Sequence, residues 1–134
     1  MIWKPKTFFC RAYLLLFKWN NQSFTNLYAS KIGLDNNLEA PKRFDNKINS
    51  KFHESTPVFT KDGKTMYFTR NNFLDGKRGK DSKSVTLLKM YKSTLVDGQW
   101  ANIAELPFNS DNYSVAHPAL SLDEKTLYFI FIQK

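Results

Sequence analysis

A segment of this chain occurs twice, and this repeat constrains the fold more than any other sequence feature. Residues 53–69 read HESTPVFTKDGKTMYFT, and residues 114–130 read SVAHPALSLDEKTLYFI. When Pro57 is aligned with Pro118, six of the twelve positions from the proline to the Tyr-Phe pair are identical. A repeat with a period of sixty-one residues indicates an array of similar supersecondary units, so the fold is best argued from the repeat.

Each copy has the pattern of a β-hairpin. A short apolar strand follows the proline, a polar turn comes next, and the second strand is rich in β-branched and aromatic residues. We interpret Asp62 and Asp123 as turn formers, whose carboxylates cap backbone N–H groups, and not as metal ligands. Bulky side chains at successive positions of the second strand predict a strand packed between neighbouring sheets. The alternative is two unrelated hairpins in one α+β domain.

The repeat extends beyond the hairpins. A strand, a turn and a second strand are predicted in residues 24–44, and the same order returns in residues 87–108, with Tyr91 at the position of Tyr28. An Asn-Ser dipeptide precedes each proline by eight or nine residues. The predicted strands outside the hairpins are residues 24–32, 38–44, 87–95 and 103–108.

These strands predict an all-β fold. Four antiparallel strands per repeating unit are typical of a β-propeller blade, and we assign a half blade to residues 24–44, a full blade to 53–108 and a half blade to 115–134. Propellers close with about four to eight blades, so about two blades predict a fragment of a larger propeller, a truncated reading frame or a self-assembling chain. Exposed blade edges and an apolar face would favour self-association.

The first segment, residues 1–20, is of a different kind and precedes a predicted propeller region of residues 21–134. It has lysines and an apolar run, the outline of a secretion signal, but Arg11 interrupts the run. A signal peptide, a buried strand, a segment outside the fold and an amphipathic membrane-surface helix remain alternatives. The formal charge of +8 is partly concentrated here. The single cysteine, Cys10, excludes an intrachain disulfide framework, and no run of eighteen apolar residues predicts a membrane-spanning helix.

Residues 70–83, RNNFLDGKRGKDSK, predict a long exposed loop with basic side chains. It could contact a phosphate, an acidic glycan or a protein partner, and the alternative is an ordinary solvated loop. Trp100 is a further candidate for partner or carbohydrate contact, with core packing as its alternative. The candidate contact residues are Arg70, Lys77, Arg78, Lys80, Lys83 and Trp100.

The sequence contains no motif for a catalytic, cofactor or metal site. It lacks a Gly-x-Ser-x-Gly elbow, a phosphate-binding glycine loop, a His-Glu-x-x-His motif and the carboxylate spacing of a calcium loop. His53 and His117 are not equivalent in the repeat, and we interpret each as a hydrogen-bonding turn residue. We therefore predict a protein without enzymatic activity and without a cofactor.

The motif from proline through Asp-Gly-Lys-Thr to Tyr-Phe resembles the TolB-like, or WD-like, propeller repeat of envelope proteins. Residues 57–68 fit it, and residues 118–129 fit it except at Glu124; the proline usual before the aspartate is Lys61 or Leu122 here. The LYAS segment, the Asn-Ser pairs and the Asp-Gly-Lys-Arg-Gly-Lys-Asp loop are similar to propeller regions of OmpA-family outer-membrane proteins. The similarity covers residues 24–129 and includes no OmpA-like domain, so it does not imply peptidoglycan binding.

The resemblance implies a non-enzymatic scaffold of the cell envelope. We expect it to be periplasmic and peripheral to the outer membrane, with envelope proteins and not nucleic acid as partners. One alternative is an accessory propeller of a peptidase or glycan-active enzyme. Another is a basic nucleic-acid-binding protein, which would show a steep salt dependence of binding.

Overall fold

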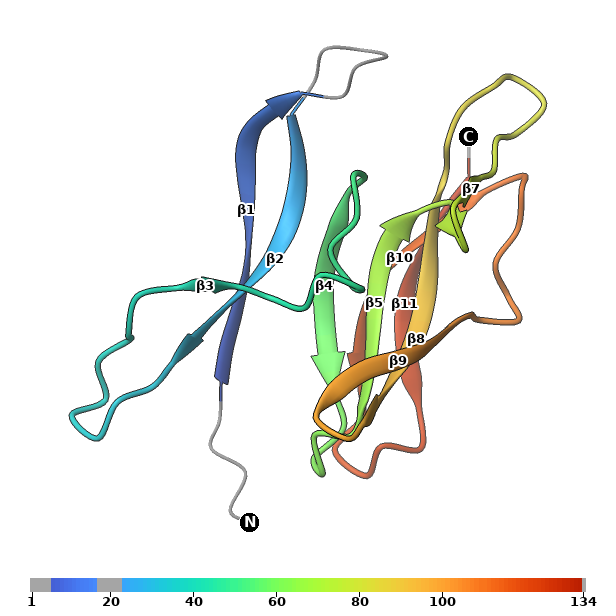
Figure 1. Cartoon of the computed structure of the whole chain (residues 1–134). Coiled ribbons are helices and arrows are strands. Elements are labelled where there is room, and N and C mark those ends of the chain that lie inside the picture. The colour runs from blue at the N-terminus through green and yellow to red at the C-terminus, as the bar shows by residue number, and fades with distance from the viewer. Residues whose placement is uncertain (1–5, 17–22, 134) are drawn as a thin grey trace. The chain divides into compact units, whose positions relative to one another are not determined.

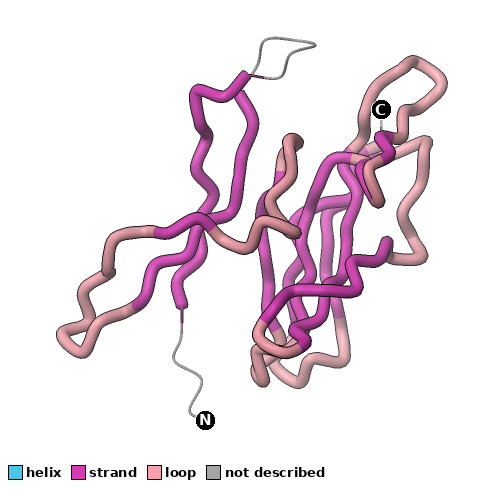
Figure 2. Tube along the Cα trace, viewed as in Figure 1, coloured by secondary structure: helices cyan, strands magenta, loops and turns pink. Residues whose placement is uncertain are grey.

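The protein is an all-β structure of antiparallel sheets, as the sequence predicts. The computed structural model describes residues 6–16 and 23–133, and Figure 2 shows only strands and loops among them. The chain divides into two compact units, Met1–Ser55 and Thr56–Lys134. Each unit has its own antiparallel sheet, so the two are described separately.

The first unit contains a three-stranded sheet in the order β1-β2-β3. Its strands are β1 (Lys6–Leu16), β2 (Ser23–Lys31) and β3 (Lys42–Arg43). The predicted second strand of residues 38–44 is thus reduced to β3 and an isolated bridge between Leu38 and Ile32. Pro41 lies between them and has no backbone N–H to donate to a sheet, which accounts for the interruption.

The N-terminal segment forms a strand that pairs with β2. In this pairing Phe9 lies opposite Tyr28, just as Phe68 lies opposite Tyr91 in the second unit. Arg11, two positions after Phe9, therefore has the same register as Arg70. The other parts of the 1–20 segment, residues 1–5 and 17–20, lie outside the described residues, and the signal-peptide alternative stays a prediction.

The second unit contains a four-stranded sheet in the sequential order β4-β5-β8-β9, shown in green to orange in Figure 1. Its strands are β4 (Glu54–Phe59), which starts two residues before the unit, β5 (Thr65–Asn71), β8 (Leu88–Val96) and β9 (Gln99–Glu105). The last strand begins at Gln99 and not at the predicted Ile103. Asp97 and Gly98 both have positive φ, 49° and 76°, and such a two-residue turn leads directly into the next strand.

A second hairpin follows this sheet. It consists of β10 (Ser114–Leu120) and β11 (Leu127–Ile132), and β10 packs against β5 and β8. The predicted 70–83 loop is shorter than expected, because β5 continues to Asn71 and a small hairpin of β6 (Phe73–Leu74) and β7 (Lys77–Arg78) lies within it. In the core of this unit, the apolar residues with no exposed surface are Met66, Phe68, Met90, Tyr91, Val115 and Ala116.

The two hairpin turns have the same hydrogen bonds. In each, the aspartate accepts a bond from a hydroxyl two residues earlier and one from a backbone N–H two residues later. The two distances are 2.6 and 2.9 Å at Asp62, and 2.6 and 3.2 Å at Asp123. The following residue has a positive φ in both turns, 68° at Gly63 and 57° at Glu124. The hydroxyl bonds, first among the causes, hold the pKa of both carboxyls below its usual value.

Candidate functional site

After each sheet, an asparagine side chain binds the backbone of the central strand of that sheet. Asn49 accepts a bond from the Leu27 N–H at 2.7 Å and donates to the Leu27 carbonyl at 2.9 Å. Asn109 makes the same two bonds to Met90, at 3.0 and 2.8 Å. These residues are the Asn-Ser asparagines of the repeat. Because the side-chain amide binds the backbone N–H and the carbonyl of one residue at the same time, it holds the segment after each sheet to one position of the central strand.

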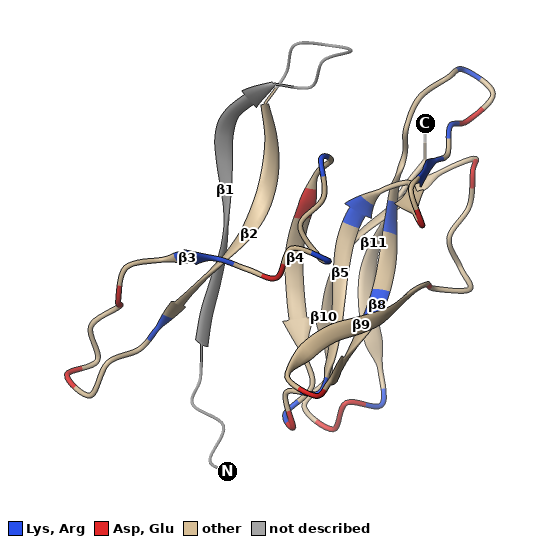
Figure 3. Cartoon of the chain, in the orientation of Figure 1, with Lys and Arg blue, Asp and Glu red and all other residues tan. Residues whose placement is uncertain are grey.

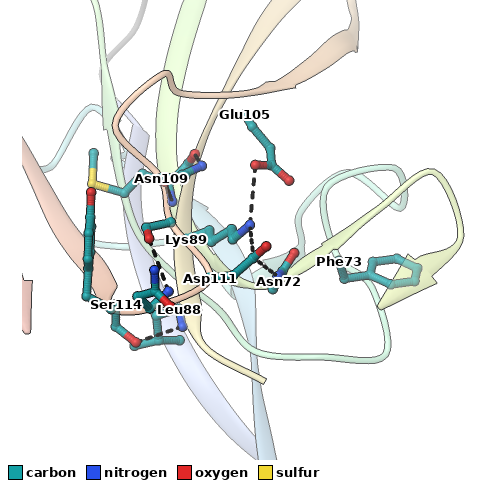
Figure 4. A network of polar contacts seen from close by, with 12 residues as sticks. Asn72, Phe73, Leu88, Lys89, Glu105, Asn109, Asp111 and Ser114 are labelled. Carbon is teal, nitrogen blue, oxygen red and sulfur yellow. Dashed lines mark hydrogen bonds and ion pairs between the residues drawn. The ribbon is translucent and has the colours of Figure 1, made fainter. Parts of the chain in front are cut away.

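A second repeated link lies close by along the same strands. The backbone N–H of Leu88 donates to Ser114 Oγ at 3.0 Å, and the backbone N–H of Thr25 donates to His53 Nδ1 at 3.1 Å. His53 and Ser114 occupy the same position sixty-one residues apart in the alignment. Figure 4 shows the Leu88 to Ser114 bond beside that of Asn109. In both units the central strand thus binds a side chain at the equivalent position of the repeat, His53 in the first unit and Ser114 in the second.

His53 has a structural role, in agreement with its interpretation as a hydrogen-bonding residue. Its Nδ1 accepts the Thr25 backbone bond, so the neutral ring carries its proton on Nε2. Partial burial lowers the pKa of His53, because burial disfavours the charged ring. His117 is exposed, and its backbone N–H donates to Thr69 Oγ1 at 3.0 Å. In the part of the chain that the structure describes, no cluster of three His, Cys, Asp or Glu residues could hold a metal ion.

A buried lysine forms the centre of a small polar network, shown in Figure 4. Lys89 Nζ lies 2.9 Å from Asp111 Oδ1 and 3.6 Å from Glu105 Oε2, while Asn72 donates to the same Asp111 oxygen at 3.2 Å. The hydrogen bond from Lys89, and its charge, hold the pKa of Asp111 below its usual value. The network satisfies a lysine that is only 6% exposed, and it fixes the loop before β10 to β8.

Arg70 lies in β5 and is only 3% exposed, so it does not lie on the exposed loop where the sequence analysis placed it. Its guanidinium lies 5.1 Å from the Phe68 ring centre and 5.4 Å from that of Tyr91, and cation–π attraction explains how a charge is accommodated there. The Tyr91 hydroxyl accepts a bond from the Phe73 N–H at 3.2 Å. Burial is the main cause that raises the pKa of Tyr91 to about 12.

Trp100 is also buried, with 7% of its surface exposed. Its ring packs against Phe59, with 5.6 Å between ring centres. This is the core-packing alternative of the sequence analysis, and it removes the indole from the surface available to a partner. Arg70 thus lies over Phe68 of its own strand and Tyr91 of the neighbouring β8, whereas Trp100 of β9 packs against Phe59 of β4, the other outer strand of the same sheet.

The other candidate contact residues lie on a basic hairpin loop after β5. Lys77, Lys80 and Lys83 are exposed and Arg78 is half-buried, and the cartoon in Figure 3 marks Lys and Arg positions along this loop in blue. Their role as partner contacts stays a prediction.

The apolar edge expected from the repeat lies at β11, shown without charged residues in Figure 3. Five consecutive residues of this strand are between 37% and 59% exposed. They are Tyr128, Phe129, Ile130, Phe131 and Ile132. An exposed run of large apolar side chains along a strand is a recognised sign of an interaction surface. The repeat predicts exposed blade edges but not the particular residues that form them.

The comparisons with known proteins gave no match. No known family model matches the chain, and no curated protein or solved structure is significantly similar to it. Among the described residues, no helix combines the length and the apolar character needed to cross a membrane.

Proposed function

We propose that this protein is a non-enzymatic interaction module, a sector of a TolB-like β-propeller that offers a scaffold surface to proteins of the cell envelope. The observation that carries this proposal is the repetition of the hydrogen bonds that hold the segment after each sheet to a central strand of that sheet. Leu27 and Met90 are bound by Asn49 and Asn109 in the same way. A unit that recurs with the same internal bonds can be repeated around an axis.

Contacts between the two hairpin turns support this arrangement. The Lys61 backbone N–H donates to Glu124 Oε1, and its ammonium donates to the Leu122 carbonyl. The first hairpin turn therefore lies beside the second one, at the same end of the unit. Successive blades of a propeller have this relation, with equivalent turns adjacent around the ring.

Exposed loops at the ends of the strands would form the partner surface. In the described second unit the basic loop that carries Lys77, Lys80 and Lys83 is the most charged of these, and it suits an acidic partner. The resemblance to envelope propellers is the reason for placing the protein in the periplasm, peripheral to the outer membrane.

The propeller part of the proposal is tested by extending the full chain. Residue 134 corresponds to residue 73 in the repeat, so residues 74–134 can be appended in frame several times to reach about six blades. Solution scattering should then show a compact, closed, monomeric particle. An elongated or aggregated product would contradict the proposal.

The scaffold part is tested by activity and localisation. Screening against peptide and glycan substrates should show no turnover, and turnover lost on substitution of His53 would favour an enzyme instead. Binding to nucleic acid with a steep salt dependence would favour the nucleic-acid alternative. Fractionation of Gram-negative cells that express the chain should place it with the envelope, and a purely cytosolic distribution would contradict this assignment.

A further inference from the structure

The second strand of each hairpin has a very different environment in the described structure. In β5, Phe68, Thr69 and Arg70 are between 0% and 3% exposed; β8 pairs along the whole strand from Thr65 to Asn71, and β10 packs against it. Their counterparts in β11 are between 37% and 52% exposed. They are Phe129, Ile130 and Phe131.

Two aromatic side chains of β11 have contacts within the unit, whereas one edge of the strand has no paired strand in the described structure. Phe129 stacks on Phe108 with 4.2 Å between ring centres, and Phe131 lies 4.4 Å from the Tyr113 ring. These contacts come from the segment between β9 and β10. The only strand that pairs with β11 in the described structure is β10. The remaining edge therefore corresponds to the edge of β5 that β8 fills.

The chain itself contains a second strand of the β8 type. Tyr28 and Ser30 of β2 occupy the positions of Tyr91 and Ser93 in β8, and both serines donate to a carbonyl of the following strand or loop. In the described structure the edge of β2 that corresponds to the β5-binding edge of β8 is occupied by β1. β1 and a β11 strand would compete for the same edge.

We propose that β11 of one copy of this chain pairs with β2 of a second copy, in the place of β1. The pairing rests on the proposed propeller function and identifies its partner as another copy of the chain. By the register of β5 on β8, Phe129 lies opposite Tyr28 and Tyr128 opposite Ala29 of the second copy. The β10-β11 and β2-β3 pairs then complete a four-stranded sheet of the β4-β5-β8-β9 type.

Three features favour β11 over β1 as the partner of β2. β11 keeps the Tyr and Phe of β5 in register and is preceded by the equivalent threonine, Thr126, whereas β1 keeps only the phenylalanine and the arginine. The β1 pairing is also irregular, with a register shift between Ala12 and Leu16. In addition, β11 has none of the charged side chains or prolines that protect an edge strand from pairing.

The exchange is heterologous, since β11 is used on one copy and β2 on the other. Such contacts produce rings when the rotation closes and filaments when it does not. With about two blades per copy and about four to eight blades per ring, closure requires about two to four copies.

Disulfide trapping tests the pairing in the full chain with Cys10→Ser as background. Ala29→Cys and Tyr128→Cys variants are mixed and oxidised, and cross-linked dimers are quantified. Residues opposite each other in an antiparallel pair have the Cα separation that a disulfide needs. We expect a cross-linked dimer of the two variants. The matched control replaces Tyr128→Cys with Phe129→Cys, which points to the other face and should cross-link about tenfold less.

A lock on β1 provides the second arm. Phe8→Cys with Ala29→Cys, or Lys6→Cys with Lys31→Cys, joins residues that are paired between β1 and β2 and should form an intrachain disulfide. Either lock should convert the oligomer to a monomer on size-exclusion chromatography with light scattering, and reduction should restore the oligomer. The second lock uses exposed Lys31 and controls for folding defects at Phe8.

Three results would overturn the exchange. They are a chain that is monomeric at every concentration, an oligomer that both locks leave intact, and cross-linking of Tyr128→Cys to itself in place of Ala29→Cys, which would show pairing between two β11 strands. Each leaves the proposed propeller function standing if the extended chain still forms a closed monomeric ring. Failure of that extended chain, in contrast, contradicts the function itself.

Discussion

Replacement of Asn109 by alanine should destabilise the second unit strongly. The side chain makes bonds of 3.0 and 2.8 Å to the N–H and carbonyl of Met90, a residue with no exposed surface. The Met90 carbonyl keeps a bond from the Leu106 N–H at 3.2 Å, but the Met90 N–H loses its partner. Each lost hydrogen bond costs about 1 kcal/mol net, and a buried donor left unpaired costs about 1–3 kcal/mol. Because these costs partly describe the same loss, we expect the free energy of unfolding to fall by about 2–4 kcal/mol.

Urea unfolding followed by tryptophan fluorescence measures this loss as a change in the free energy of unfolding. Wild type and variant are compared at one protein concentration, since self-association changes apparent stability. The matched control is Asn112→Ala, an exposed asparagine three residues away, which should change stability by less than about 0.5 kcal/mol. If Asn109→Ala is as mild as the control, the asparagine link does not hold the sheet and the hairpin together.

Three further predictions concern single side chains. Burial lowers the pKa of His53 below 6.5, so the stability that the neutral ring contributes should be complete above pH 6.5 and decline as the pH falls through the lower pKa of the folded state. His53→Ser, which imitates Ser114, should remove this part of the pH dependence in urea unfolding at pH 5–8, and an unchanged profile would refute the role of the ring. Gly98→Ala should cost about 1 kcal/mol by thermal unfolding, because φ is 76° and no atom within 4 Å would add a clash; no loss would show that the turn relaxes. Trp100→Ala should cost about 3–5 kcal/mol by the same assay, because a buried indole against Phe59 is removed; a loss below about 1 kcal/mol would place the ring at the surface.

Local chemistry made the hairpins predictable from the sequence. The turns around Asp62 and Asp123 depend on side chains within a few residues, and their spacing is visible in the repeat. A turn at Asp97 and Gly98 was predicted from the sequence. The positive φ values of both residues, which let β9 begin directly after the turn, were not.

Long-range contacts were not predictable in the same way. Asn49 and Leu27 are twenty-two residues apart, and the repeat marked the Asn-Ser pairs without showing what they bind. Charge suggested exposure for Arg70, but this residue lies in β5 and is buried over two aromatic rings. For β1, the Lys-Thr-Phe-Phe-Cys-Arg sequence resembles Lys-Thr-Met-Tyr-Phe-Thr-Arg with one residue fewer, and this was the signal that could have identified the strand.

The central claim is that the two hairpins are neighbouring copies of one unit, with their turns side by side. Spin labels at the exposed positions Lys64 and Lys125, each two residues after a turn aspartate, test this by a pulsed electron-resonance distance. Packed sheets lie about 10 Å apart, so with the label arms we predict a narrow distribution at about 10–20 Å. A broad distance distribution, or one centred beyond about 30 Å, is too long for adjacent packed sheets and would contradict the account.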